Sequence, residues 1–304
     1  MPPKTPAFWE RKNGIARCLL PLSYVYLAIH KLKMKLAEPY KGAIPVVCIG
    51  GVTAGGSGKT PVVHAILELI REVGLFENPV ILTRGYGGSL KGPTVVDLSA
   101  HSAMDVGDEA LIHAMHAPTI VSRNRMQGAI LGAAMDADVI LMDDGLQNNT
   151  IAKDLTILVL DKNYGCGNGY VIPAGPLREP LEDALTRSDV VIHVGAPVVI
   201  SSHAKGTVYY GFAGLAHPEK FKSTLLENGF TLAGFESFAD HHPYSDQDIA
   251  RLKKQAGDAC LITTEKDFVK ISPSLQNGIE VLRIAHNLQD KNEILEKLRG
   301  LRPS

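Results

Sequence analysis

Apolar runs of strand length alternate with segments of helical periodicity along most of the chain. The strand-like runs are rich in Val, Ile and Leu and lie at 44–49, 79–83, 119–121, 139–142, 155–160 and 190–194. Helical periodicity marks the segments 62–73, 108–116 and 123–135. Apolar strands that alternate with helices are typical of a mostly parallel sheet covered by helices on both faces. The pattern therefore predicts an α/β fold.

The alternation restarts near residue 205, well beyond an irregular stretch at 165–177 that is rich in Gly and Pro. Further strands are predicted near 208–212, 230–235, 260–263 and 279–284, and further helices near 218–227, 246–255 and 292–298. We therefore predict an N-terminal helix in 1–38, a core in 39–205 and a smaller α/β lobe in 206–304, whose last helix can pack back on the core. Two lobes imply a cleft, and ligands commonly bind in clefts.

The first region predicts an amphipathic helix. Apolar side chains recur at helical spacing, at Ile15, Cys18, Leu19, Leu22, Val25, Tyr26, Ile29, Leu32 and Leu36. Basic residues flank them, at Arg11, Lys12, Arg17, Lys31, Lys33 and Lys35. Three interpretations stay open: a helix in a membrane interface, a helix packed on the core, and a spanning segment. The uncharged stretch 18–29 is shorter than the ~20 residues that span a bilayer, and no clear cleavage site of a signal peptide follows it.

The composition sets limits on the class of protein. Apolar residues make up 45% of the 304 residues, which is ordinary for one large or two medium domains with a real core. A net charge of −1 gives no reason to expect nucleic acid as a partner. The cysteines lack the spacing of metal ligands, which indicates reduced thiols in a cytosolic chain. They are Cys18, Cys48, Cys166 and Cys260.

A glycine-rich loop between a predicted strand and a predicted helix carries the strongest chemical signal. It reads Thr53-Ala54-Gly55-Gly56-Ser57-Gly58-Lys59-Thr60. Glycines let backbone N–H groups curl around a polyphosphate, and the helix N-terminus adds a positive dipole. Lys59 is expected to reach the β- and γ-phosphates, and Thr60 to hold Mg²⁺. The general pattern has Gly where this chain has Thr53, but the remaining residues keep the chemistry. The alternative is a glycine turn that precedes Lys-Thr by chance.

Two carboxylates, Asp143 and Asp144, end the apolar run at 139–142. In phosphate-loop enzymes this position serves Mg²⁺, directly or through water. The alternative is a surface turn, because Asp-Asp-Gly is good turn chemistry. The position downstream of a phosphate loop favours the functional interpretation.

Basic side chains are expected near the ends of other elements. Arg84 lies in a glycine-rich loop after a strand, and Arg123 and Arg125 open a helix. Arg178 precedes Glu179, and this pair can serve phosphate and metal. For each of them the alternative is a solvated charge or a surface ion pair.

Groups that can exchange a proton occur at two places. Asp108 and Glu109 open a helix, where they can take part in chemistry or simply favour the helix dipole. His241 and His242 follow Asp240. One imidazole polarised by a carboxylate can act as a general base, whereas adjacent histidines make a weak metal site.

The motifs form an ordered set that covers nearly the whole chain. They are Gly55-Gly56-Ser57-Gly58-Lys59-Thr60-Pro61, Arg84-Gly85-Tyr86-Gly87-Gly88, Val106-Gly107-Asp108-Glu109, Asp143-Asp144-Gly145-Leu146-Gln147, Arg178-Glu179-Pro180-Leu181, Asp240-His241-His242-Pro243-Tyr244 and Thr263-Thr264-Glu265-Lys266-Asp267. Apart from the phosphate loop each is weak alone, but the ordered set is specific. It resembles the tetraacyldisaccharide 4′-kinase (lipid A 4′-kinase) family. The chain departs from that family where Gly51, Ala110, Asn148 and His217 stand in place of Asn, Pro, His and Asn.

The resemblance implies a phosphate-loop NTPase-like core and a kinase that uses ATP and Mg²⁺. Such a kinase transfers the γ-phosphoryl group to the 4′-hydroxyl of a tetraacylated glucosamine disaccharide 1-phosphate in lipid A biosynthesis. It works at the cytoplasmic face of the inner membrane of a Gram-negative bacterium. An acylated substrate stays in the bilayer, which fits the amphipathic N-terminal helix. Neither nucleic acid nor an obligate protein partner is expected.

The resemblance also assigns roles to single residues. Residues 53–60 hold the nucleotide, and the metal ligands are Thr60, Asp143 and Glu179. Phosphate or substrate is bound by Arg84, Glu109, Arg123, Gln147 and Arg178. Asp144 takes part in catalysis, and Asp108 accepts the proton of the sugar hydroxyl. A histidine pairs with Asp108, with His241 slightly preferred over His242; this dyad spans the two lobes, so closure assembles the site.

An alternative from another class is a phosphate-loop switch or metallochaperone-type NTPase that acts through protein partners. Such a protein needs neither a lipid-facing helix nor a hydroxyl-activating dyad. A kinase needs the lipid disaccharide for fast ADP release, whereas a switch does not. A third interpretation, a soluble sugar kinase, predicts no binding to vesicles.

Overall fold

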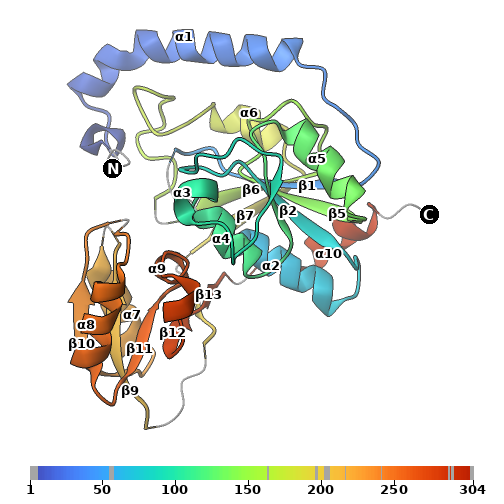
Figure 1. The fold of residues 1–304 in the computed structure, drawn as a ribbon. Helices are drawn as coiled ribbons and strands as arrows, with labels where there is room; N and C mark the ends of the chain where they lie inside the picture. The colour runs from blue at the N-terminus through green and yellow to red at the C-terminus, as the bar shows by residue number, and fades with distance from the viewer. Residues whose placement is uncertain are drawn as a thin grey trace.

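The core of the molecule is a mostly parallel sheet (Figure 1). The computed structural model describes residues 6–54, 58–162, 164–195, 198–201, 206–215, 217–240, 242–286, 288 and 291–301. Within these, seven strands pair in the order β3-β4-β2-β5-β1-β6-β7. They are β1 (Val46–Gly50), β2 (Pro79–Thr83), β3 (Thr94–Val95), β4 (Thr119–Val121), β5 (Val139–Asp143), β6 (Leu155–Asp161) and β7 (Val190–Val194). The pairs are parallel except β3 with β4, which confirms the predicted α/β class.

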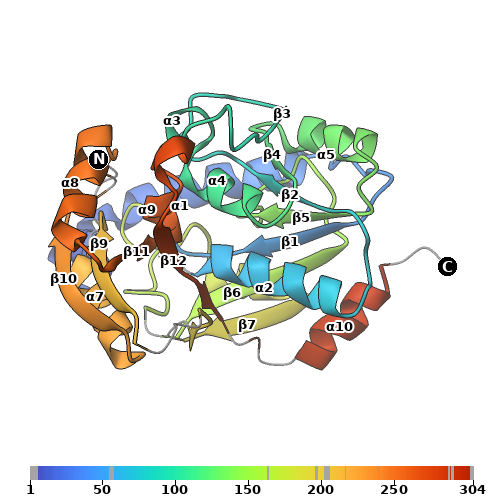
Figure 2. The same ribbon diagram turned by 60° about the horizontal axis from the view of Figure 1, so that its bottom comes forward.

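Helices cover both faces of this sheet. Successive residues of a strand point to opposite sides, and all five residues of β1 are buried, so both of its faces need a cover. Val47 and Ile49 of β1 share a buried cluster with α2 (Lys59–Glu72) and α10 (Lys291–Arg299). Figure 2 shows these two helices along one face of the sheet. Val46 and Cys48 face the opposite side, where they pack with α5 (Arg125–Ala134). The shorter helices of the core are α3 (Ala103–Val106), α4 (Asp108–Ala114) and α6 (Leu181–Thr186).

The smaller lobe is built on a parallel sheet of its own, in the order β10-β9-β11-β12. Its strands are β9 (Val208–Ala213), β10 (Thr231–Ser237), β11 (Cys260–Thr264) and β12 (Ile279–Leu282). Its helices are α7 (Pro218–Glu227), α8 (Asp246–Ala256) and α9 (Glu265–Phe268), with a 3-10 turn, η2 (Pro273–Leu275). Separate buried clusters line the two faces of this sheet, so the lobe has its own core. The predicted second α/β lobe is confirmed.

A short antiparallel ribbon joins the lobes. β8 (Val198–Val199), which follows β7, pairs with β13 (Ile284–Ala285), which precedes α10. The prediction of one strand over 279–284 is wrong, because the chain leaves the small sheet after β12 and changes partner. At the break the Arg283 N–H donates to Ser201 Oγ (2.6 Å), and the Arg283 carbonyl accepts from the Ile200 N–H (3.0 Å).

The N-terminal helix α1 (Gly14–Leu36) lies across the outside of the core (Figure 1). Asn13 caps it by accepting from the Ala16 N–H (2.9 Å), and Pro21 lies within it. Ser23, one of its few buried residues, donates to the Val171 carbonyl (2.7 Å) and thereby fixes α1 to the loop before α6. The 3-10 turn η1 (Ala7–Trp9) precedes α1.

Most of α1 is exposed, including a row of large apolar side chains. They are Ile15, Leu22, Tyr24, Val25, Ile29, Leu32 and Leu36. This exposure speaks against the interpretation of α1 as a helix packed into the core. By length and composition alone, α1 could also cross a membrane. The structure therefore leaves the interfacial and the spanning interpretations in place.

Candidate active site

The phosphate loop begins in a fixed position beside a second loop. Thr53 is buried and forms a β-bridge with Leu177, and the Ala54 N–H donates to the Pro176 carbonyl (2.8 Å). Gly58 has φ +70° at the N-cap of α2, a left-handed conformation that favours glycine. Lys59 and Thr60 follow in the first turn of α2. Gly55, Gly56 and Ser57 lie outside the described residues.

The two acids at the end of β5 point to different partners. Asp143 is buried, and its Oδ2 lies 3.0 Å from His113 Nε2. Its Oδ1 is also buried and has no hydrogen-bond partner among the described residues. Asp144 follows with φ +50°, which is uncommon for a residue other than glycine. This backbone turn separates the neighbouring carboxylates, so that each can serve a different group.

Two cations converge on Asp144. Its Oδ1 lies 3.5 Å from Lys59 Nζ, and both of its carboxylate oxygens accept from Arg178 Nη1 at 2.9 Å. Burial alone would raise the pKa of Asp144, but the charges of Lys59 and Arg178 outweigh it and lower the pKa. Asp144 is therefore held ionised beside the phosphate loop.

Glu109, in the first turn of α4, belongs to the same electrostatic site. Desolvation raises the pKa of its carboxyl, and the nearby charge of Asp143 raises it further, against the opposing effects of His113 and Lys59. Although Glu109 is exposed, the charges of Asp143 and Asp144 thus act on the pKa of its carboxyl. The two acids of the site are thus shifted in opposite directions, because the pKa of Asp144 is lowered and the pKa of Glu109 is raised.

A row of hydrogen bonds leads from Asp144 toward α1. Gln147 accepts from Arg178 Nη1 (3.2 Å) and donates to Glu179 Oε1 (2.9 Å) and to the Gly51 carbonyl (3.1 Å). Glu179, 2% exposed, is also paired with Arg187. Its Oε2 lies 3.9 Å from Nε2 of His30 on α1. Gln147, Arg178 and Glu179 are thus brought together as one group beside the phosphate loop, and this group reaches the N-terminal helix.

The arginines named from the sequence differ in their surroundings. Arg84 is exposed, and Arg123 is exposed with Nη2 donating to the Gly88 carbonyl (3.2 Å). Arg125 is buried, and Nη1 donates to the Ser122 carbonyl (2.5 Å). Burial lowers the pKa of Arg125 to about 10, although the charges of Asp143 and Asp144 oppose this effect. Arg125 is therefore a fixed positive charge that acts on the acid pair from within the core.

Asp108, the first residue of α4, faces the smaller lobe. Lys270 Nζ lies 3.9 Å from Asp108 Oδ2 and 3.3 Å from Asp267 Oδ1. Asp267 is fully buried and also accepts from the Thr264 hydroxyl (2.8 Å). The Thr-Thr-Glu-Lys-Asp motif therefore places Lys270 at the junction of the lobes. Sequence reasoning missed Lys270, which lies just outside that motif and whose partner Asp108 is remote in the chain.

The two histidines proposed for the dyad, His241 and His242, lie in the segment that precedes α8. His241 lies outside the described residues. His242 Nε2 lies 3.2 Å from Asp248 Oδ2, and its ring packs against Phe238 and Tyr244. The described contacts of His242 thus belong to the small lobe. The pairing of either histidine with Asp108 stays a prediction.

Comparison with solved structures gives a match over nearly the whole chain. The LpxK structure from Aquifex aeolicus, determined in complex with ATP, superposes with a TM-score of 0.79 at 25% sequence identity. The match covers 94% of this chain and 99% of the other.

Sequence comparison gives the same result with curated relatives. The tetraacyldisaccharide 4′-kinase of Paramagnetospirillum magneticum is 40% identical over 306 residues, which cover 93% of this chain and 94% of the relative. The kinase of the same name from Methylobacterium radiotolerans is 40% identical over 323 residues and 98% of each chain. The family model described as tetraacyldisaccharide-1-P 4′-kinase matches residues 15–301. The family model spans both lobes, and the relatives align over nearly their whole length, in agreement with the resemblance seen in the motifs. The chain belongs to the tetraacyldisaccharide-1-P 4′-kinase family.

Proposed function

We propose that this protein transfers the γ-phosphoryl group of ATP to the 4′-hydroxyl of a tetraacylated glucosamine disaccharide 1-phosphate. The observation that carries the proposal is the approach of Lys59 to Asp144, at 3.5 Å, in a chain whose family model spans residues 15–301. In a phosphate-loop kinase the loop lysine neutralises phosphate charge and the acid at the end of the strand serves the metal. Before nucleotide enters, each of these groups balances the charge of the other.

The residues at the end of β5 fit a Mg²⁺ ion that arrives with ATP. Asp143 Oδ1 is a buried carboxylate oxygen without a described partner, which is the kind of ligand that Mg²⁺ prefers. Thr60, in the first turn of α2, supplies the hydroxyl expected of this loop. Glu179, which is bonded to Gln147 and paired with Arg187, would be the third residue that holds the ion. The bound ion would neutralise charge on the transferred phosphoryl group.

Asp108 is the proposed acceptor of the proton that leaves the sugar hydroxyl. Its carboxylate opens α4 and faces Lys270 of the smaller lobe at 3.9 Å. A hydroxyl that enters between the lobes would meet both the carboxylate and a cation. Phosphoryl transfer depends largely on such positioning and on charge neutralisation. A histidine of the 241–242 pair would stabilise the protonated state of the dyad.

The proposed location is the cytoplasmic surface of the inner membrane of a Gram-negative bacterium. The exposed apolar side chains of α1, with Lys31, Lys33 and Lys35 in its last turns, suit a helix in the interface of an anionic bilayer. Glu179 lies beside His30 of α1, so the proposed membrane helix and the proposed active site are adjacent. An acceptor with its acyl chains in the bilayer would then present its sugar to the site.

Acceptor-dependent release of ADP tests the proposal. We expect ADP release from Mg·ATP to be slow alone and fast when a tetraacyl disaccharide 1-phosphate is supplied in mixed micelles, with a phosphate appearing on the 4′-oxygen. The matched control is the same disaccharide already phosphorylated at the 4′-position, which cannot accept. Equal ADP release with both lipids would reject the kinase assignment and favour a nucleotide switch.

A further inference from the structure

A row of polar side chains leads from Asp143 to the smaller lobe. Asp143 Oδ2 lies 3.0 Å from His113 Nε2, and His113 Nδ1 lies 3.0 Å from His64 Nε2. The ring of His64 stacks on that of His116 with a centroid distance of 4.0 Å. His116 Nε2 lies 3.2 Å from Glu265 Oε1. The proposed phosphoryl-transfer chemistry assigns no role to the histidines or to Glu265.

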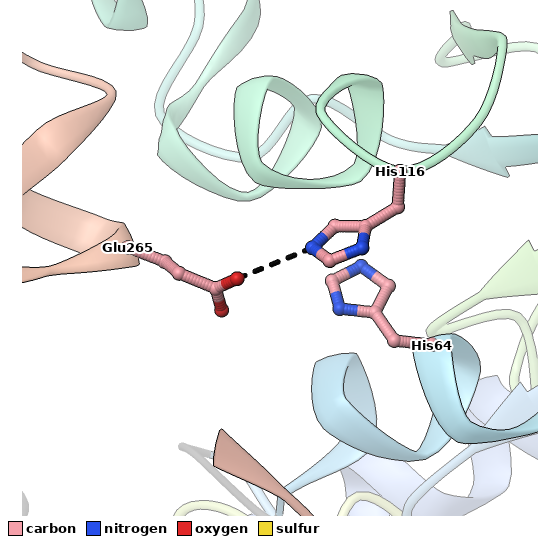
Figure 3. Close-up of side chains that lie close together, drawn as sticks. All are labelled: His64, His116 and Glu265. Atoms are coloured by element: carbon pink, nitrogen blue, oxygen red, sulfur yellow. Dashed lines mark hydrogen bonds and ion pairs between the residues drawn. The ribbon is translucent and has the colours of Figure 1, made fainter. Parts of the chain in front are cut away.

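The outer three members come from different parts of the fold. His64 lies on α2 and His116 just after α4, both in the core, whereas Glu265 begins α9 of the smaller lobe. Figure 3 shows the rings of His116 and His64 one above the other. One nitrogen of each ring points to the side on which the Glu265 carboxylate lies. Each residue offers a ligand atom, and these atoms all lie within 4.8 Å of one another.

The inner members set the tautomer of His64. Asp143 as a carboxylate can only accept, so His113 Nε2 donates to it. Neutral His113 then has a lone pair on Nδ1, which accepts from His64 Nε2–H. This leaves the lone pair of His64 on Nδ1. The far nitrogen of a metal-binding histidine usually donates to a fixed acceptor such as a carboxylate, a carbonyl or water, and His113 Nδ1 is the acceptor in this position.

The protonation of His64 also suits a metal. Burial lowers the pKa of His64 to about 2, and the neighbouring imidazoles of His113 and His116 add to this effect. Because a metal must displace a proton from a charged imidazole, a ring that is already neutral binds at lower cost.

We propose that His64, His116 and Glu265 form a binding site for a borderline transition-metal cation, above all Zn²⁺, that joins the two lobes. Two imidazole nitrogens and a carboxylate oxygen are a ligand set that Zn²⁺ accepts, with water in the fourth position. Mg²⁺ and Ca²⁺ prefer oxygen ligands, so the site discriminates against the ion used with ATP. Tetrahedral ligand atoms lie roughly 3.4 Å apart. The contact between His116 and Glu265 is already that short, so only the more widely spaced ligand atoms would have to converge, by at most about 1.4 Å.

A cation at this position would act as a clamp between the lobes. It would tie α9 to α2, whose first turn carries Lys59 and Thr60. Through His64 and His113, the cation would also be linked by hydrogen bonds to Asp143 Oδ2. The proposal rests on the side-chain geometry alone and does not depend on the reaction proposed above.

Metal binding to the full-length, tag-free protein tests the site. We would titrate Zn²⁺ by calorimetry in a large excess of Mg²⁺, and use Co²⁺ as a spectroscopic probe whose visible absorption is strong in tetrahedral sites. The wild type is expected to bind one Zn²⁺ at this site and to show the tetrahedral Co²⁺ spectrum. His64→Gln, His116→Gln and Glu265→Gln should each weaken Zn²⁺ binding by at least about tenfold and lose the spectrum.

The exposed His193 supplies the matched control, because His193→Gln removes an imidazole from the core surface away from the cluster. It should bind Zn²⁺ like the wild type. Zn²⁺ should also raise the melting temperature of the wild type and of His193→Gln but not of Glu265→Gln. If His64→Gln fails to fold, Glu265→Gln decides the test, since Glu265 is only part-buried at the lobe junction. No Zn²⁺ binding by the wild type, or equal binding by Glu265→Gln, would overturn the proposal; the latter would place the metal elsewhere, such as at the exposed thiol of Cys18.

Discussion

Lys270 of the smaller lobe reaches across the lobe junction to within 3.9 Å of Asp108 at the start of α4. The lysine is 5% exposed and also forms an ion pair with the fully buried Asp267. A cation that is buried between two carboxylates from different lobes helps to fix the distance between them. This relationship makes the placement of the proposed proton acceptor dependent on the smaller lobe.

Lys270→Met should therefore lower both stability and turnover. It leaves Asp267 without its cation in a buried position, which can cost up to about 3–5 kcal/mol. Urea unfolding monitored by circular dichroism measures the stability, and acceptor-dependent ADP release measures turnover. The exposed Lys254 of α8 provides a control, and Lys254→Met should change neither quantity. Unchanged stability of Lys270→Met would mean that Asp267 does not need the lysine.

Lys59→Ala should nearly abolish transfer, because it removes the charge placed to meet the β- and γ-phosphates. We expect turnover to fall by about 10²–10⁴-fold if that charge acts mainly in the transition state. The measurement is kcat for acceptor-dependent ADP release at saturating ATP. Lys220→Ala, at an exposed position of α7, should retain full activity. Near-normal turnover by a folded Lys59→Ala protein would contradict the assignment of the phosphate loop.

Asp143→Asn should raise the Mg²⁺ concentration that half-saturates the reaction. The amide keeps the size of the side chain but removes the charge of the carboxylate, whose Oδ1 has no hydrogen-bond partner among the described residues. The Mg²⁺ dependence of turnover, measured at fixed ATP, separates this effect from general damage. Asp136→Asn, at an exposed turn after α5, is the matched control. Identical Mg²⁺ curves for wild type and Asp143→Asn would remove Asp143 from the metal site.

Asp108 and one histidine of the 241–242 pair should act as a unit. Asp108→Ala and His241→Ala should each lower kcat strongly, and the double variant should be little worse than the worse single variant. ATP binding should persist in all of them, because the phosphate loop is unchanged. Independent, multiplicative losses would refute a dyad. A harmful His242→Ala beside a silent His241→Ala would move the role to His242, which would then have to leave Asp248.

Removal of residues 1–36 should release the protein from vesicles that contain anionic lipid. The exposed apolar side chains and flanking lysines of α1 supply the expected attraction. Vesicle co-sedimentation measures binding, and thermal melting reports on the rest of the fold. The body should still melt cooperatively, because few residues of α1 are buried. Continued vesicle binding by the truncated protein would place the membrane contact elsewhere.

The parts of the site that could be predicted from the sequence are those encoded locally. Lys59 and Thr60 follow a glycine loop between a strand and a helix, and Asp143 and Asp144 follow an apolar run, so the chain itself brings each near the end of a strand. Parallel strands then bring these ends to the same edge of the sheet. The α/β fold followed from the same local periodicity.

The contacts between lobes could not be predicted in this way. Lys270 meets Asp108, and Glu265 meets His116, only after two separately folded lobes are placed against each other. No local periodicity encodes that placement. The change of strand partner at Arg283 could not be predicted either. β12 and β13 form one nearly continuous strand-like pattern in the sequence, although β12 pairs with β11 and β13 pairs with β8.

The ribbon of β8 and β13 has a consequence for synthesis on the ribosome. The chain leaves the core through β8, builds the smaller lobe, and returns through β13 to deliver α10. Ile294 and Leu298 of α10 are fully buried in the cluster that contains β1 and α2. A nascent chain that ends before residue 291 therefore leaves part of this buried cluster uncovered, where loss of one such side chain alone costs about 2–5 kcal/mol. Because α10 is made last of these elements, it can pack on the main sheet only after the entire smaller lobe has emerged, so synthesis of that lobe precedes the final packing of the core.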